Sequence, residues 1–340
     1  MNSFRTEIFP KKSSLHIDYH KKVLFMGSCF TENIGNKLLE YKFPALINPF
    51  GVLYNPLSAQ KALEIIISKK RFTDKDLNFE NDKWFSFYHH GSFSSPDKEE
   101  VLNNINDKID KSHRFLKKAR SLFITFGTSW YYKLIKTDEI VANCHKLPAD
   151  LFDRKLLDIE QITEPWKILI KELKKFNPGL KIIFTVSPIR HWKDGAVNNQ
   201  LSKSTLIVAI HETLKEFEHL SYFPSYEIMM DDLRDYRFYD DDFLHPNSQA
   251  INYIWDKFKS VFIEEGTMQI SKQVHKIVKA VNHKPFHPKT NSYKEFLDSS
   301  SEKIEQLGNK YPFIDFSKEK LHFANEYKNH GFTNYKNSSF

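Results

Sequence analysis

Short apolar runs alternate with longer segments of helical spacing, and this alternation limits the folds open to the chain. The helical segments cover residues 31–41, 57–69, 158–176, 199–217 and 246–263. The apolar runs, which we predict to be strands, cover residues 23–26, 45–50, 122–126, 182–186 and 222–228. Continuous apolar strands joined by helices are typical of a parallel sheet covered on both faces. The sequence therefore predicts an α/β protein with a three-layer, doubly wound parallel sheet.

Two insertions and a different C-terminal region complete the predicted organisation. Residues 72–107 are aromatic and polar, and residues 130–153 have the pattern of a hairpin that turns at 136–139. Both insertions fall where a lid or a pocket wall would lie. After residue 264 the alternation stops and the chain becomes helix-like and lysine-rich. We therefore predict an α/β catalytic domain over 9–264 and a helical extension with a loose tail over 265–340.

Charge and composition exclude several classes of protein. Fifty Lys and Arg against 43 Asp and Glu give a net charge of only +7, and the two signs are interleaved. We therefore expect no nucleic-acid partner. No apolar run reaches the roughly 18 residues that a membrane span needs, so stable membrane insertion is not expected. The sequence does not identify protein partners or an oligomeric state.

Cofactor and metal motifs are missing from the sequence. It contains neither a Gly-x-Gly-x-x-Gly nor a Gly-x4-Gly-Lys-Ser/Thr pattern, and the histidines at 89–90 and 283–287 lack metal-ligand spacing. We expect no cofactor and no metal. Two separate cysteines form no disulfide framework, and the start lacks a signal-peptide pattern, so a reduced, cytoplasmic protein is expected.

Ser28 lies between the first predicted strand and the first helix, in the segment Gly27-Ser28-Cys29-Phe30. Ligands of doubly wound sheets bind beyond the carboxyl ends of the strands, and this is where Ser28 stands. A serine in that place is a nucleophile if a base removes its proton. A helix cap is the competing interpretation, since serine is a preferred cap residue.

Asp242 precedes His245 by three residues, just before the last predicted core helix. This spacing lets the carboxylate accept from one imidazole nitrogen and leaves the other nitrogen free to act as a base. The competing interpretation is a solvated acidic loop, 240–242, that caps the helix. Taken together, Ser28 and the Asp-x-x-His pattern favour a serine-dependent hydrolase or transferase, which neither feature would indicate alone.

The segment Gly27-Ser28-Cys29-Phe30 resembles the signature of the GSCFA domain, a bacterial family similar to the SGNH (GDSL-like) hydrolases. The resemblance spans residues 9–261 and extends to further segments in the same order: 48–56, 126–130, 143–146, 187–191 and 244–247. It implies an SGNH-hydrolase-like, flavodoxin-like sheet. It also implies that Ser28 is the nucleophile, that Asp242 and His245 are the acid and the base, and that the backbone N–H groups of Ser28 and Gly51 help to form the oxyanion hole.

The sequence departs from the wider superfamily at two places. Gly27 stands where the superfamily usually has Asp before its nucleophile, and residues 127–129 replace the usual Asn after the third strand. Thr128, Ser129 or Asn143 are candidates for the missing oxyanion donor. Loss of one donor costs roughly 3–4 kcal/mol of transition-state stabilisation.

Other polar residues near the predicted strand ends are candidate substrate contacts, and we include Ser129, His145, Arg190 and His191. The planar fork of Arg190 suits a carboxylate or phosphate, or a surface acid. Cys29 is a less favoured nucleophile than Ser28, because a lone cysteine is more often a small buried residue.

The sequence thus predicts a serine-dependent ester hydrolase or O-acyltransferase that acts on an acylated small molecule, glycan or lipid through Ser28, His245 and Asp242. The aromatic run at 84–88 suits stacking on a carbohydrate or packing in the core. The alternative is a ligand-binding protein without catalysis that keeps the same pocket.

Overall fold

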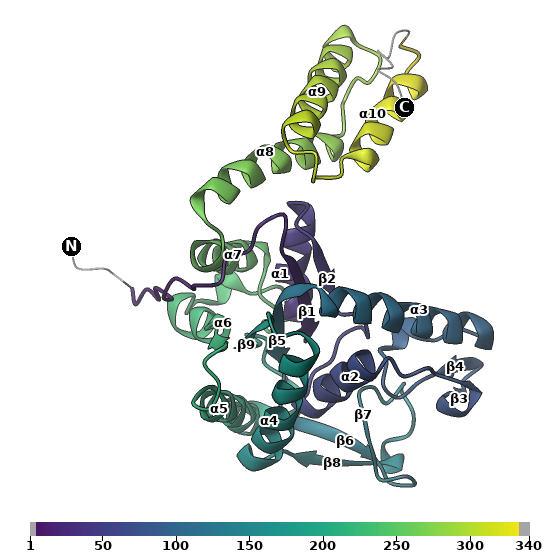
Figure 1. The fold of residues 1–340 in the computed structure, drawn as a ribbon, viewed down its shortest axis with the longest axis vertical. Helices are drawn as coiled ribbons and strands as arrows, with labels where there is room; N and C mark the ends of the chain where they lie inside the picture. The colour runs from purple at the N-terminus through teal and green to yellow at the C-terminus, as the bar shows by residue number, and fades with distance from the viewer. Residues whose placement is uncertain (1–4, 333–340) are drawn as a thin grey trace. The chain divides into compact units, whose positions relative to one another are not determined.

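The computed structural model describes residues 5–332, which form two compact units (Figure 1). The larger unit contains residues 5–15, 21–36 and 45–262, and the smaller one contains 16–20, 37–44 and 263–332. Among the described residues, no helix has both the length and the apolar character needed to cross a membrane.

The core of the larger unit is a parallel sheet of five strands: β1 (Lys22–Gly27), β2 (Ala45–Ile47), β5 (Ala119–Phe126), β9 (Lys181–Val186) and β10 (Leu220–Tyr222). Their order across the sheet is β2-β1-β5-β9-β10, and every adjacent pair is parallel. Counted along the chain this is the order 2-1-3-4-5 of flavodoxin-like sheets, whose ligands bind where the strand order reverses. The predicted fold class is confirmed, and the reversal lies between β1 and β5.

Helices cover both faces of this sheet because successive strand residues point in opposite directions. One face, with Leu24 and Leu122, packs against α2 (Pro56–Ser68), α3 (Lys98–Lys117), α4 (Ile159–Phe176) and α5 (Gly195–Leu214). On the other face, Phe25 and Phe123 stack at 4.6 Å between ring centroids, and Phe258 of α7 (Ser248–Phe262) packs on both. The remaining core helix, α1 (Cys29–Glu40), follows β1 directly.

Both insertions contain small antiparallel sheets. The first has the hairpin of β3 (Asn78–Glu80) and β4 (Lys83–Phe85), and its end belongs to α3, a helix that the sequence analysis missed. The second has the predicted hairpin of β6 (Trp130–Leu134) and β7 (Glu139–Val141), to which β8 (Phe152–Leu156) adds a third strand. Short 3-10 turns lie in these insertions at Asp74–Asp76, Gly91–Phe93 and Ala149–Leu151, and two more lie outside them at Trp192–Asp194 and Tyr236–Phe238.

The last predicted strand, 222–228, is wrong beyond its first residue. β10 ends at Tyr222, and the chain continues as α6 (Ser225–Glu227) and a π-helical turn at Ile228–Asp232. Pro224 has no N–H to donate to a neighbouring strand, so it ends the ladder at this edge. The second run also stops early, because β2 ends at Ile47 where Asn48 turns to a positive φ of 42°.

The smaller unit is mostly helical. It contains α8 (Glu265–Val281), α9 (Asn291–Lys310) and α10 (Ser317–Asn329), whose apolar faces bury Val274, Leu297 and Phe323. The end of the predicted loose tail, 334–340, lies outside the described residues.

Candidate functional site

Ser28 follows β1 directly, beside the point where the strand order reverses, and Gly27 sets its position. Gly27 has a φ of +137°, and a Cβ built on it would lie 2.1 Å from the carbonyl oxygen of Thr125. Its N–H donates to Oδ1 of Asn48 at 3.0 Å. No other residue type fits this close approach of β1 to β5, so the glycine before Ser28 is a structural requirement.

The Ser28 side chain is enclosed. Only 1% of the residue is exposed, and its Oγ has no hydrogen-bond partner among the described residues. The neighbouring Gly127 explains part of the enclosure: a Cβ at that glycine would lie 3.3 Å from Ser28 Cβ and 3.4 Å from the ring of Tyr54. Tyr54 is held in place because its carbonyl accepts from the N–H groups of Gly127 and Thr128. A buried hydroxyl without a partner is costly in a protein interior.

Asp242 and His245 form a compact pair in the loop before α7. Oδ2 of Asp242 lies 2.5 Å from Nδ1 of His245, and Oδ1 accepts from the backbone N–H groups of Leu244 and His245, both at 2.9 Å. These hydrogen bonds, first the one from the backbone of His245 and then the one from its ring, lower the pKa of Asp242 to about 2. Asp242, rather than Asp240 or Asp241, is therefore the carboxylate that orients the imidazole.

The Asp242–His245 pair is open to solvent, and 49% of the His245 side chain is exposed. The two halves of the expected triad are therefore not joined by a hydrogen bond in this structure. The ring of Tyr54, which neighbours Ser28, packs edge-on against His191 at 5.4 Å. His191 is close enough to His245 to be affected by its charge, although burial is the main reason why the pKa of His191 is lowered to about 4.

The backbone groups that the resemblance implies for the oxyanion hole already have acceptors. The N–H of Ser28 donates to the Thr125 carbonyl at 3.1 Å, and the N–H of Gly51 donates to the Asn48 carbonyl at 2.7 Å. Gly51 itself has a φ of +75°, and a Cβ there would lie 2.2 Å from that of His90. To stabilise an oxyanion, these two N–H groups would have to give up their hydrogen bonds to the Thr125 and Asn48 carbonyls.

The side chains proposed as further oxyanion donors differ in their surroundings. The Thr128 hydroxyl bonds with Oγ of Ser202 at 3.0 Å, and Ser129 is fully buried with bonds to the same residue. Asn143 uses Oδ1 to accept from the N–H of His145, and it lines a pocket of about 530 Å³. The amide of Asn143 therefore faces a space that a ligand can enter, whereas Ser129 belongs to the core.

Two pockets lie at this edge of the sheet. The larger, with a volume of about 530 Å³, is lined by Tyr54, Thr128, Trp130, Asn143, Arg154 and His191, among others. The smaller, of about 300 Å³, adjoins the loop that carries His245 and is lined by Arg190, Trp192, Phe243 and Leu244, among others. Neither wall includes Ser28 or His245.

Of the expected substrate contacts, the structure places His191 in the larger pocket and Arg190 in the smaller one. His145 lines neither pocket: its ring packs on Phe85 at 4.2 Å, and Nε2 bonds with the Ser86 carbonyl at 3.0 Å. Burial lowers the pKa of His145, which favours the neutral ring. The position of His145 is thus that of a structural side chain, like Ser129.

Lys203 of α5 is a buried residue whose importance the sequence did not reveal. It is fully buried, and Nζ donates to the carbonyls of Gly127 and Ser187, each at 2.7 Å. These carbonyls lie just beyond the ends of β5 and β9, so Lys203 ties the two strand ends together. Burial lowers the pKa of Lys203 to about 7. The sequence does carry one indication of this burial, because helical spacing places Lys203 on the same face of the helix as Asn199, Leu206 and Ile210.

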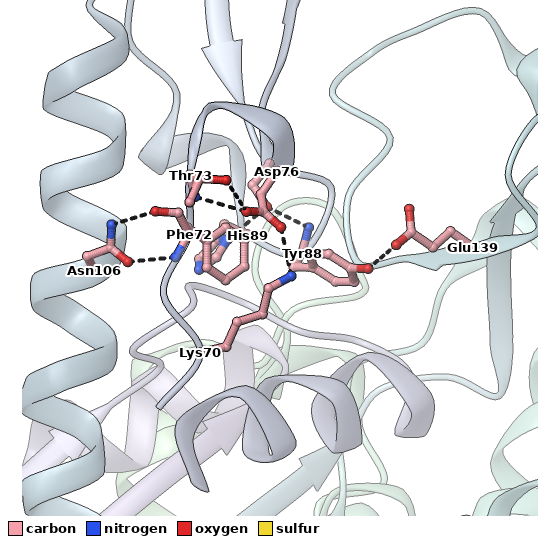
Figure 2. Close-up of polar contacts among 9 residues, drawn as sticks. Lys70, Phe72, Thr73, Asp76, Tyr88, His89, Asn106 and Glu139 are labelled. Carbon is pink, nitrogen blue, oxygen red and sulfur yellow. Dashed lines mark hydrogen bonds and ion pairs between the residues drawn. The ribbon is translucent and has the colours of Figure 1, made fainter. Parts of the chain in front are cut away.

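The first insertion packs against the Gly51 turn through His89, which lies beside Phe72 (Figure 2). The ring of His89 stacks on that of Phe50 at 4.4 Å, is 1% exposed, and bonds with Oγ of Ser86 at 3.1 Å. Burial lowers the pKa of His89 to about 3, so the ring is neutral. The side chain of Asn106, on α3, bonds with both the N–H and the carbonyl of Phe72.

Surface contacts complete this anchoring of the insertion, as Figure 2 also shows. Lys70 forms an ion pair with Asp76 at 2.7 Å, and the hydroxyl of Tyr88 donates to Glu139 at the start of β7. The two insertions are therefore linked to each other. Phe85 and Phe87 are buried between them, so these members of the aromatic run 84–88 pack in a core and offer no carbohydrate platform. Within residues 5–332, no group of three His, Cys, Asp or Glu side chains is arranged to hold a metal ion.

Among solved structures, the chain is similar to a carbohydrate esterase of family 3 from Talaromyces cellulolyticus, with 9% identity, a TM-score of 0.32, and coverage of 74% of this chain and 98% of the other. It is also similar to an acetyl xylan esterase from the rumen bacterium Butyrivibrio proteoclasticus, with 11% identity, a TM-score of 0.32, and coverage of 61% and 55%. These TM-scores are too low for either likeness to bear on function. No curated protein sequence matches the chain.

Family models match nearly all of the two units. The GSCFA family model matches residues 22–258, which include Ser28, Asp242 and His245. A second model, described as the C-terminal domain of GSCFA domain proteins, matches residues 274–329, which contain the C-terminal part of α8 and all of α9 and α10. The chain therefore belongs to the GSCFA family.

Proposed function

We propose that this protein is a serine-dependent acyl-ester hydrolase or O-acyltransferase. Oγ of Ser28 attacks the ester carbonyl while Nε2 of His245 takes the hydroxyl proton, and Asp242 stabilises the imidazolium. The leaving alkoxide takes that proton as the C–O bond breaks, and an acyl-serine remains. Water or a sugar hydroxyl then gives its proton to His245 and attacks the acyl group. His245 passes a proton to Oγ of Ser28 as the acyl–serine bond breaks, which releases the acid or the new ester.

The Asp242–His245 geometry is the observation that carries this proposal. The carboxylate uses Oδ2 on the ring and Oδ1 on two backbone N–H groups, so ring and loop are oriented together. With Nδ1 engaged, Nε2 is the nitrogen available to a substrate or a nucleophile. A solvated acidic loop does not require one carboxylate to hold both the backbone and the histidine ring.

The proposal requires a rearrangement around Ser28, because its Oγ is enclosed and the implied oxyanion N–H groups are occupied. Catalytic hydrogen bonds are often long or misaligned without substrate and tighten in the complex. Tyr54 is the residue whose displacement would open Ser28 toward the larger pocket, since it neighbours Ser28 and lines that pocket. Asn143 is then the side-chain amide best placed in the pocket wall to meet an oxyanion.

The larger pocket suits an acylated glycan or a similar polar substrate. Trp130 and Tyr132 give it aromatic surface, and Arg154 lies 4.3 Å above the Trp130 ring and pairs with Asp194 at 2.6 Å. Aromatic rings beside polar groups are the usual surfaces for sugars. Lys193, whose Nζ bonds with the Tyr132 hydroxyl at 3.1 Å, adds a positive charge at the rim.

A ligand-binding protein without catalysis is the second candidate function, and the enclosure of Ser28 is the observation that favours it. A hydroxyl that is 1% exposed and bonds to no histidine is not an accessible nucleophile in this conformation. On this alternative the pockets bind a ligand, and Asp242 and His245 contact it only through hydrogen bonds.

The test is intact mass after exposure to a small fluorophosphonate, which labels activated serines. We expect one adduct on the wild type and none on Ser28→Ala or His245→Ala. Ser92→Ala is the matched control, because the Ser92 hydroxyl lies 3.1 Å from Nδ1 of the half-buried His90 and forms a second serine–histidine pair. An adduct that survives Ser28→Ala but is lost in Ser92→Ala would show that Ser92, and not Ser28, is the activated serine. No adduct on folded wild type would favour the binding protein.

A further inference from the structure

The segment between β9 and α5 separates the two pockets. Arg190 and Trp192 line the smaller pocket, whereas His191 and Lys193 line the larger one. Alternate residues of an extended segment point to opposite sides, and His191 has the extended angles φ −90° and ψ 102°. One strip of chain therefore gives a different chemistry to each pocket.

Arg190 carries a charge that no carboxylate balances within residues 5–332. Its Nε is enclosed without a hydrogen-bond acceptor, and its guanidinium carbon lies 5.0 Å from the centre of the Trp192 ring. The other arginine on this pocket wall, Arg234, has a partner, since it bonds with Asp231 at 2.7 Å. An enclosed guanidinium N–H without an acceptor is costly, so a bound anion would supply what the protein does not.

Aromatic side chains form much of the rest of this wall. Besides Trp192 it includes Tyr236, Tyr239 and Phe243, and the rings of Tyr236 and Phe243 lie 5.8 Å apart. Phe243 is two residues from His245, so the smaller pocket adjoins the loop that carries the proposed base. The volume, about 300 Å³, is at the lower end of small-molecule sites.

The charge balance selects the kind of anion. Arg190 is one cation without a partner, and the same wall carries the acid Asp235, whose nearest cation is Arg237 at 3.9 Å. A doubly charged phosphate would meet one available guanidinium and a nearby carboxylate. A singly charged carboxylate matches the two parallel donors of one guanidinium.

We propose that the smaller pocket, lined by Arg190 and Trp192, binds a carboxylate that is attached to an aromatic or apolar group. One part of this inference rests on the proposed function, namely that the bound carboxylate belongs to the substrate. The substrate class is then an ester whose alcohol or acyl part carries a free carboxylate, held by Arg190 while the remainder occupies the larger pocket.

Binding can be tested without catalysis by fluorine NMR on Ser28→Ala protein. The probes are para-fluorophenylacetate, the uncharged para-fluorophenylacetamide, and para-fluorophenyl phosphate. We expect the carboxylate to bind roughly tenfold more tightly than the amide. Equal binding of carboxylate and amide, or tighter binding of the phosphate, would overturn the assignment.

Variants of the two arginines locate the effect. Arg190→Met should abolish the preference for the carboxylate over the amide, and Arg190→Lys, which keeps the charge without the fork, should reduce it. Arg234→Met is the matched control and should leave the preference intact. An equal loss in Arg190→Met and Arg234→Met would show that general charge, and not the Arg190 site, attracts the probe. If the carboxylate binds at Arg190 but fluorophosphonate does not label Ser28, this inference stands and the proposed hydrolase fails.

Discussion

The two halves of the proposed site, Ser28 and the Asp242–His245 pair, are held in opposite ways. Ser28 is enclosed between β1 and β5, and the backbone contacts of Gly27 and Thr125 fix its position. The pair lies in a solvent-exposed loop and is fixed by hydrogen bonds that Asp242 makes within four residues of chain. The fold thus determines the place of the proposed nucleophile, whereas a local turn determines that of the proposed base.

Because of this difference, we expect substitutions in the two halves to have different effects. Changes around Ser28 act on sheet packing, so we expect them to alter the free energy of unfolding. Changes in the exposed pair leave the core untouched, so we expect them to alter chemistry alone.

The largest loss of stability is expected for Gly27→Ala. The new Cβ would lie 2.1 Å from the Thr125 carbonyl oxygen at a φ of +137°, so both strain and steric overlap oppose the fold. We expect a loss of about 4 kcal/mol in the free energy of unfolding, measured by urea titration. Gly179→Ala is the control in the same unit, because the nearest atoms would lie 3.6 Å from its Cβ. A loss below about 1 kcal/mol in Gly27→Ala would contradict the tight approach of the strands.

The exposed pair is tested by Asp242→Asn. The amide keeps an oxygen for the N–H groups of Leu244 and His245 but loses the charge that stabilises an imidazolium. We expect fluorophosphonate labelling of Ser28 to slow at least roughly a hundredfold, with an unchanged urea midpoint. Because the pKa of Asp242 is about 2, its ionisation should not limit the wild-type rate above about pH 4. A shifted midpoint with normal labelling would assign Asp242 to structure.

The sequence predicted the sheet well because its signals are local. Four apolar runs lie at the strands where they were expected, and a flavodoxin-like order was confirmed. The helix α3 was missed because polar residues dominate it: only one face, with Val101, Ile105 and Ile109, is buried. The run at 222–228 was misjudged because its apolar residues serve β10 and then a helix, with Pro224 between them.

The site was harder to predict than the fold. The Asp-x-x-His spacing is local, and it identified the correct aspartate for the His245 contact. The enclosure of Ser28 depends on Tyr54 and Gly127, which approach from distant parts of the sequence. The same holds for the two carbonyls that meet Lys203, and no sequence period encodes such long-range contacts.

Lys203→Met tests the enclosed side through pH. In the folded protein burial lowers the pKa of Lys203 to about 7, against 10.5 for an ordinary lysine. Between these values the unfolded chain holds a proton that the folded chain has released, so raising the pH favours folding. Between about pH 7 and 9, the stability of the wild type relative to Lys203→Met should rise by about 1 kcal/mol per pH unit. A difference that stays constant with pH would mean that Lys203 keeps its charge when buried.

The smallest change at neutral pH is expected for His89→Phe, behind the Gly51 turn. Phenylalanine keeps the stacking on Phe50 and removes the buried Nε2, which has no partner in the described chain, at the expense of the Ser86 contact. We therefore expect a change within about 1 kcal/mol at pH 7. Because the folded pKa of His89 is about 3 and the unfolded one about 6.5, the wild type should lose more stability than the variant as the pH falls between them. Urea midpoints at several acidic pH values measure this, with His90→Phe as the control in the pocket wall. Equal acid sensitivity of wild type and His89→Phe would show that the folded protein accommodates a charged His89 ring. The surroundings of His89 would then tolerate charge as the exposed loop of His245 does.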